Sequence, residues 1–278
     1  NRTKFMELVG SEAATAEKFE FNETVSSILG WVTMVISTAL IMLVNVEDVV
    51  SLIEVGANSA YLVKNGEYFR LFTYQFIHIG WLHLIMNLVA LKFFGPPVET
   101  LAGWPLFIGI YFLCGISGGA AAVYAGQPLS AGASAAVLGL LSVSMVFELF
   151  KVKGSESLKR RNNFSTLVFL LIINLIIGAV EQAVDNSAHI GGLLAGALIG
   201  LLLVPVVNSQ FLRRLAGVIS LLGCLAVAGV SMYQMFDCRS RGFYPQNPGS
   251  FHKVSIFSGR SNLEIPAGWL KEAGKETE

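Results

Sequence analysis

The stretch AHIGGLLAGALIGLLLVPVV, residues 188–207, indicates the class of fold. It is uncharged and apolar over roughly the 20 residues that a helix needs to cross a bilayer, yet it carries a histidine in its first turn. Similar apolar runs recur along the chain, and hydrophobic residues make up 54% of the 278 positions. Charged residues make up only 14%, against roughly 25% in a typical soluble domain. The sequence therefore predicts an all-α membrane protein.

Seven apolar runs are predicted to span the membrane as helices. They are residues 25–46, 81–94, 105–125, 134–150, 166–180, 188–207 and 215–236, and an extension of the second run towards 101 is the alternative. Residues 47–70 mix apolar and charged side chains, which is typical of a segment lying at the membrane surface. The tail, residues 237–278, is rich in Gly, Pro, Ser and charge, and we expect it to be loosely ordered.

Basic residues in two of the predicted loops indicate the orientation of the chain. Lysines and arginines lie in the loop 151–161 and at Arg213 and Arg214, so the positive-inside rule places both loops in the cytoplasm. The amino-terminal segment, residues 1–24, is then cytoplasmic and the tail lies outside. The second, fourth and sixth spans all run from the outer face to the inner one.

The overall charge and the cysteines exclude some classes of partner. The formal net charge is zero, so no basic surface indicates a nucleic acid. Cys114, Cys224 and Cys238 do not have the spacing of metal ligands. We therefore expect neither a metal nor a cofactor. The expected surrounding of the chain is a lipid bilayer, and the sequence leaves the oligomeric state open.

Histidines lie near the outer ends of two spans, where polar groups are costly and are usually functional. They are His78, His83 and His189. His83 and Asn87 are four residues apart, hence on one face of the second span, so their side chains can point at one spot. The structural alternative is that such a histidine only bonds a backbone carbonyl between helices.

A serine and a histidine are predicted to share this depth. Ser134 follows Gly132 and Ala133 and begins the fourth span, where free backbone N–H groups and the helix dipole favour a developing anion. His189 lies in the first turn of the sixth span. Gly192, Gly196 and Gly200 repeat at every fourth position of this span, on the same helix face as His189. Such small residues let membrane helices approach closely. Ordinary packing between helices is the alternative explanation of those glycines.

A second serine matches a familiar nucleophile pattern. Residues 115–119 read GISGG, which fits G-x-S-x-G around Ser117. That pattern indicates a nucleophile only on a turn between a strand and a helix. Here it lies inside an apolar span, so helix packing explains it better.

These motifs together resemble the rhomboid family of intramembrane proteases. The family has H-x4-H-x3-N on the second span, G-x-S-x on the fourth and A-H-x-x-G-x-x-x-G on the sixth. Here these are His78 to Asn87, Gly132 to Ala135 and Ala188 to Gly196. The resemblance implies a catalytic core of six helices over residues 25–207, with a linker and an extra seventh helix over residues 208–236.

The resemblance also implies the roles of individual residues. His189 would take the proton of Ser134, whose oxygen attacks a peptide carbonyl of a substrate, and His83, Asn87 and the Ser134 N–H would hold the oxyanion. The implied substrates are membrane proteins with a single span, cut near the outer end of the span. Asp185 and Asn186 are interpreted as capping or loop-orienting residues.

The chain departs from the family pattern at positions that support the site. The family has a Trp-Arg pair in the surface segment and a Glu after the second span, which anchor that segment. Arg70 and Glu99 match this pattern, but Phe69 replaces the Trp. Leu138 stands where many members carry an aromatic ring against the catalytic histidine. The sequence does not tell how these two departures affect activity.

Two other functions compete with proteolysis. An inactive rhomboid relative would bind membrane clients without cutting them, but such proteins have lost the Ser or the His, and both are present here. A small transporter also carries intramembrane histidines and broken helices, but the sequence shows no two similar halves.

We expect the protein to lie in a bacterial plasma membrane, with an organelle membrane as the alternative. The substrate, the organism and the role of the tail are not indicated.

Overall fold

The long helices form a bundle in which each helix corresponds to a predicted span. The computed structural model describes residues 25–43, 49–152, 185–240, 251–256 and 261–266. The bundle helices among them are α2 (Val25–Leu43), α6 (Gly80–Ala102), α7 (Trp104–Tyr124), α8 (Ser134–Leu149), α11 (Asn186–Val207) and α12 (Gln210–Ser240). By length and composition, α6, α7, α11 and α12 can cross a membrane, while α2 and α8 are shorter apolar helices. The predicted span 166–180 and most of the loop 151–161 lie outside the described residues.

α6 includes the extension that the sequence offered, whereas α12 is longer than its predicted run. α6 continues through Pro96 and Pro97 to Ala102, because neighbouring helices in a membrane bundle can compensate for the backbone bond that a proline removes. α12 begins five residues before the predicted run, takes in Arg213 and Arg214, and ends at Ser240. Hydropathy alone excludes these charged ends, although a helix can continue past the apolar region.

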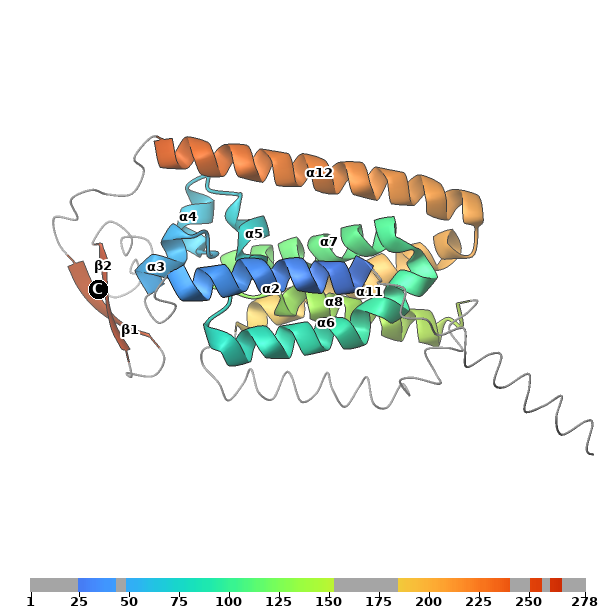
Figure 1. Cartoon of the computed structure of the whole chain (residues 1–278), viewed down its shortest axis with the longest axis horizontal. Coiled ribbons are helices and arrows are strands. Elements are labelled where there is room, and N and C mark those ends of the chain that lie inside the picture. Colours follow the sequence, from blue (N-terminus) through green and yellow to red (C-terminus); the bar gives the residue numbers. More distant parts are fainter. Residues whose placement is uncertain (1–24, 44–48, 153–184, 241–250, 257–260, 267–278) are drawn as a thin grey trace, which may run out of the picture.

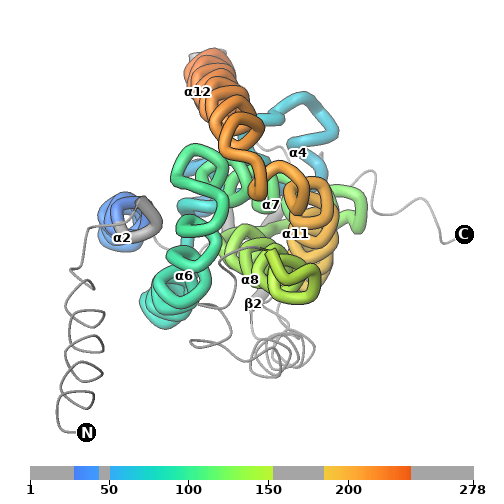
Figure 2. Tube along the Cα trace, turned by 90° about the vertical axis from the view of Figure 1, so that its right-hand side faces the viewer, coloured from blue at the N-terminus to red at the C-terminus, as the bar shows by residue number. Residues whose placement is uncertain are grey.

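α8 lies at the centre of the bundle, in contact with α6, α7 and α11. Nearly all of its residues from Ala135 to Phe147 are buried, whereas α2 and α12 keep large apolar side chains on the outside. Figures 1 and 2 show α12 along one edge of the bundle and α2 on another side, beside α6. The exposed apolar side chains of these outer helices suit a lipid environment.

α8 and α11 run parallel and pack backbone against backbone. A Cβ atom added at Gly192 would lie 2.1 Å from the carbonyl oxygen of Ala135, and one at Gly196 would lie 2.3 Å from that of Gly139. Only glycine fits at such distances, so the stripe predicted from the sequence is a close helix contact. The equal spacing, 135 to 139 and 192 to 196, fixes the register of the two helices.

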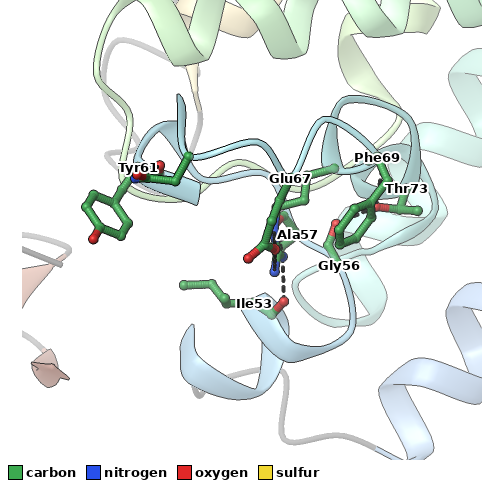
Figure 3. A network of polar contacts seen from close by, with 9 residues as sticks. Ile53, Gly56, Ala57, Tyr61, Glu67, Phe69 and Thr73 are labelled. Atoms are coloured by element: carbon green, nitrogen blue, oxygen red, sulfur yellow. Dashed lines mark hydrogen bonds and ion pairs between the residues drawn. The ribbon is translucent and has the colours of Figure 1, made fainter. Parts of the chain in front are cut away.

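The surface segment between α2 and α6 folds into short helices around a buried arginine. They are α3 (Val49–Glu54), α4 (Ala60–Lys64), α5 (Arg70–Thr73) and the 3₁₀ helix η1 (Tyr74–Phe76). The guanidinium of Arg70, fully buried, donates to the carbonyls of Ile53 at 2.6 Å and Ala57 at 2.9 Å, and pairs with Glu67 at 2.5 Å. Figure 3 shows Ile53, Ala57 and Glu67 close together in this segment. Because buried charges are stable only when paired and hydrogen-bonded, this network fixes the segment.

The tail contains secondary structure that its composition did not indicate. Strand β1 (Phe251–Ile256) pairs with β2 (Ser261–Pro266) in an antiparallel hairpin. Phe251 is opposite Pro266, and Ile256 is opposite Ser261.

Candidate active site

Ser134 is the first residue of α8, and the loop before it is held by backbone contacts. Ser130 in this loop pairs with Asn58 through two backbone hydrogen bonds of 3.0 and 2.8 Å. The N–H of Gly132 donates to the carbonyl of Tyr74 at 3.0 Å. Gly132 has a φ of +119°, which only glycine adopts readily. The loop can therefore deliver Ser134 to a fixed place at the start of the helix.

His189 lies in the first turn of α11, whose start is capped by Asp185. One carboxylate oxygen of Asp185 accepts from the backbone N–H groups of Ser187 and Ala188, as expected for an N-cap aspartate. The other oxygen accepts from the Ser130 hydroxyl at 2.5 Å. Asp185 thus joins the helix that carries His189 to the loop that carries Ser134. The capping role predicted for Asp185 is confirmed, whereas Asn186 is the first residue of the helix itself.

The side chains of Ser134 and His189 are in direct contact. Nε2 of His189 lies 2.7 Å from the Ser134 hydroxyl, within the reach that a base needs to take a proton from a nucleophile. Nδ1 of His189 is buried and has no hydrogen-bond partner among the described residues. If Nδ1 carries the proton of the neutral ring, Nε2 is free to accept the serine proton.

His83 and Asn87 lie on one face of α6, close to this pair. A Cβ atom added at Gly132 would lie 2.6 Å from Cε1 of the His83 ring and 2.7 Å from its Nε2, so the ring packs directly on the loop before Ser134. The buried amide of Asn87 donates one hydrogen to the carbonyl of His83 at 3.0 Å. An amide has two such hydrogens, so the second is available for another acceptor.

His78 is the third histidine at this end of the bundle. Its ring meets the ring of His83 edge to face, with the centroids 5.1 Å apart. Its Nδ1 lies 3.0 Å from the hydroxyl of Ser37, which belongs to α2. The sequence analysis did not identify Ser37. The feature that could have pointed to it is a polar hydroxyl within an apolar span.

The predicted supporting residues lie at different places in the molecule. Arg70 is buried in the surface segment, and its acidic partner there is Glu67, which the sequence analysis did not identify. Phe69 also packs on Arg70, with its ring centroid 5.1 Å from the guanidinium carbon. Glu99 lies near the end of α6, about 28 Å along the helix from its first residue. A supporting role of Glu99 stays a prediction, and Leu138 is buried in the core.

The glycines around Ser117 pack inside the bundle. Ser117 lies within α7, as predicted from the apolar run. A Cβ atom at Gly118 would meet Cβ of Ala135 at 2.4 Å, and one at Gly119 would meet the Tyr74 ring at 3.0 Å. These contacts explain the glycines of the pattern without a nucleophile. The described residues contain no group of three or more metal-binding side chains.

Comparison with known proteins identifies the family. The model of the rhomboid domain matches residues 65–206, which is half of the chain. The chain is 36% identical over 146 residues to rhomboid protease GluP of Bacillus subtilis, covering 52% of this chain and 28% of that protein. It is 33% identical over 154 residues to RHOMBOID-like protein 5 of Arabidopsis thaliana, covering 54% and 49%.

A third relative, Rhomboid-like protease 2 of Toxoplasma gondii, is 31% identical over 154 residues, covering 54% of this chain and 53% of the relative. In each of the three the match covers little more than half of the relative's length, or less. The chain belongs to the rhomboid family, and it is an integral membrane protein built as a helical bundle.

Proposed function

We propose that this chain is an intramembrane serine endopeptidase with Ser134 as nucleophile and His189 as general base. The observation that carries the proposal is the 2.7 Å contact between Nε2 of His189 and the Ser134 hydroxyl. The family membership supports proteolysis, since two of the relatives above are named as proteases.

Each step of the proposed reaction uses atoms of this pair. Nε2 of His189 takes the hydroxyl proton while the oxygen of Ser134 attacks the carbonyl carbon of the scissile peptide. The imidazolium then gives the proton to the leaving nitrogen, and the C–N bond breaks to leave an ester on Ser134. A water molecule then gives a proton to Nε2 of His189 while its oxygen attacks the ester carbon. The C–O bond to Ser134 breaks, the imidazolium returns the proton to the serine oxygen, and the second product leaves with a new carboxyl group. No third acid contacts His189 Nδ1 among the described residues, so a dyad is the simplest mechanism.

The oxyanion of this reaction would be held by His83, Asn87 and the backbone N–H of Ser134. Three observations support this assignment. Among the residues that the structure describes, no side chain caps the first turn of α8, which leaves its first N–H groups to donate to an anion. The ring of His83 borders the loop before Ser134. The amide of Asn87 retains a hydrogen beyond the one given to its own helix.

The proposed substrates are single-span membrane proteins, cut near the outer ends of their helices. A carbonyl within an intact helix is hydrogen-bonded and shielded, so the scissile segment must unwind to reach Ser134. Each unpaired backbone group in hydrocarbon costs several kcal/mol unless the enzyme or water replaces the lost bond. Unwinding at the outer end, where water is near, costs least.

Cleavage by dyad variants in reconstituted vesicles tests the proposal. Ser134→Ala and His189→Ala should each abolish cleavage of a transmembrane substrate, and the double variant should be hardly slower than either, because members of one catalytic unit are not additive. Additive losses would show that the two residues act separately. A parent protein that binds membrane proteins but cuts none would favour the client-binding alternative.

Substrate sequence should affect the rate if helix unwinding limits cleavage. Replacing small or helix-weakening residues near the cut with Leu should slow the reaction. Gly or Pro a few residues inward should restore it, because Gly lowers helix stability by about 1 kcal/mol and Pro by about 3. Rates that do not respond would show that unwinding is not the slow step.

A further inference from the structure

Ser37 is a buried serine of α2, and the two residues before it in the helix are exposed. Its neighbours Val35 and Ile36 on α2 are exposed, whereas Ser37 is fully buried against the turn between η1 and α6. Its hydroxyl donates to the backbone carbonyl of Phe76 at 2.7 Å and lies 3.0 Å from Nδ1 of His78. A hydroxyl without a partner at this depth is costly, so both contacts matter energetically.

These two contacts determine which nitrogen of His78 carries the proton. A serine hydroxyl has one hydrogen, and a backbone carbonyl can only accept, so the Ser37 hydrogen goes to Phe76. The contact between Ser37 and His78 is then a hydrogen bond only if Nδ1–H of His78 donates to the serine oxygen. Ser37 therefore selects the Nδ1–H form of the His78 ring.

His78 needs this selection because its ring is neutral. Burial lowers the pKa of His78 to about 3, and the adjacent His83 acts in the same direction. A neutral imidazole has one N–H and one lone pair, so protonation at Nδ1 leaves the lone pair on Nε2. Nε2 of His78 is buried and has no hydrogen-bond partner within the described parts of the chain.

The orientation of the His78 ring also restricts His83. The two rings meet at an interplanar angle of 62° with their centroids 5.1 Å apart. Gly132 closes on His83 as well, since a Cβ atom there would lie 2.6 Å from the His83 ring. His83 is thus bounded by two neighbours, one of which is held by Ser37 of α2.

We propose that Ser37 is a positioning residue of this site, which fixes the tautomer and ring orientation of His78 and through it the position of His83. The inference rests on the proposed function, in which His83 donates to the oxyanion. It assigns to α2 a part in aligning the site, in addition to its packing against α6.

The kinetic test uses the full chain in vesicles with a fluorescent transmembrane peptide that the parent cuts. Because a misplacement of about 1 Å can cost about 100-fold in rate, we expect Ser37→Ala to lower kcat by about tenfold or more. KM should change little, because the proposed role of His83 is to hold the oxyanion, which forms only after the substrate is bound. Ser37→Thr keeps the hydroxyl and should recover most of the rate. Ser144→Ala is the matched control, because the hydroxyl of that buried serine of α8 donates to the carbonyl of Leu140 in its own helix, and it should cleave like the parent.

A spectroscopic measurement separates positioning from a merely structural role. In protein labelled with ¹⁵N histidine, the two tautomers of a neutral ring give different nitrogen signals. The parent should show His78 with the proton on Nδ1, and Ser37→Ala should show a mixture or the other form. Signals with the proton on Nε2 in the parent would overturn the inference.

A second pair of variants serves if Ser37→Ala does not fold. His78→Asn places an amide about where Nδ1 stands and can still donate to Ser37, whereas His78→Gln places the amide about where Nε2 stands. Both variants lose the ring, but only the Asn variant keeps a donor for Ser37, so it should be the more active of the two. An equal or reversed order would overturn the inference.

Cleavage that survives Ser134→Ala would refute the proposed function and, with it, this inference. A parent that depends on Ser134 but is indifferent to Ser37→Ala would refute this inference alone.

Discussion

α11 and α12 follow each other in the chain but pack against the bundle in different ways. α11 meets α8 backbone to backbone, where a Cβ atom at Gly192 or Gly196 would lie 2.1 or 2.3 Å from a carbonyl oxygen. α12 meets α7 through side chains. An added Cβ at Gly109 of α7 would meet the Ser220 hydroxyl, and no described atom lies within 4 Å of a Cβ added at Gly223 or Gly229.

This difference shows which contacts the site depends on. Two backbones in contact cannot shift without changing the distance between Ser134 and His189, because each residue lies in the first turn of one of these helices. Side chains can rotate, so α12 can adjust without moving either residue. We therefore expect substitutions at α8 and α11 to affect activity strongly, and equivalent substitutions in α12 to affect it little.

Among these comparisons, the largest loss of activity is expected from glycines of α11. Gly192→Ala or Gly196→Ala must push the two helices apart, and overpacking of this kind costs about 1–3 kcal/mol. Because a shift of about 1 Å between reacting groups can cost about 100-fold, kcat/KM should fall by about that factor, with a lower unfolding temperature in detergent. Gly229→Ala is the control in α12 and should keep full activity. A Gly196→Ala enzyme as active as the parent would contradict the close-contact account.

Two arginines provide the second comparison. Arg70→Ala leaves Glu67 buried without its partner, and breaking a buried pair costs about 3–5 kcal/mol. Arg213 of α12, half-buried, donates to the carbonyl of Leu101 at 3.3 Å. Its replacement by Ala should cost about 1 kcal/mol or less. Thermal unfolding of both variants measures the difference, and similar losses would show that the surface segment is no more important than the outer helix.

Several features of the fold follow directly from the sequence, because an apolar run is a local signal. The helices α7, α8 and α11 begin and end within about two residues of the predicted runs. The glycine stripe of α11 and the Asp185 cap were also predictable, because each is a pattern of residues close together in the sequence. The direction of the two predicted helices placed Ser134 and His189 at one depth, whereas their pairing was implied by the resemblance to the family. The structure brings the two side chains together.

Other contacts of the site could not be predicted because they join distant segments. Ser130 and Asp185 are 55 residues apart, and Ser37 and His78 are 41 apart. A serine in an apolar span has many candidate partners, and only the folded chain selects one. Glu67 was missed for another reason: the family pattern pointed to Glu99, whereas the acid that pairs with Arg70 is three residues away in the same segment.

The third comparison concerns two serines that each bond across segments. Ser130→Ala removes a hydrogen bond to a carboxylate, which is worth about 1.5–3 kcal/mol, and it frees the loop before Ser134 from α11. We expect a measurable loss of stability and a several-fold lower kcat. Cleavage and unfolding measured on the same preparation would show both. An unchanged kcat would mean that Asp185 only caps its helix.

The smallest effect is expected from Ser220→Ala. Ser220 of α12 donates to the carbonyl of Pro105 at 3.1 Å, a neutral hydrogen bond at a half-buried position. Its loss should cost about 0.5–1 kcal/mol and leave cleavage unchanged. A loss of activity similar to that of Ser130→Ala would show that α12 contributes to the geometry of the site.

The central claim, that His189 activates Ser134, is tested most directly by covalent labelling with a serine-directed fluorophosphonate probe in detergent. The parent should be labelled on Ser134, Ser134→Ala should not be labelled, and His189→Ala should react at least about 100-fold more slowly because the serine has lost its base. Ser117→Ala, which changes the other serine motif, should be labelled like the parent. Labelling that survives Ser134→Ala, or is lost in Ser117→Ala, would contradict the account.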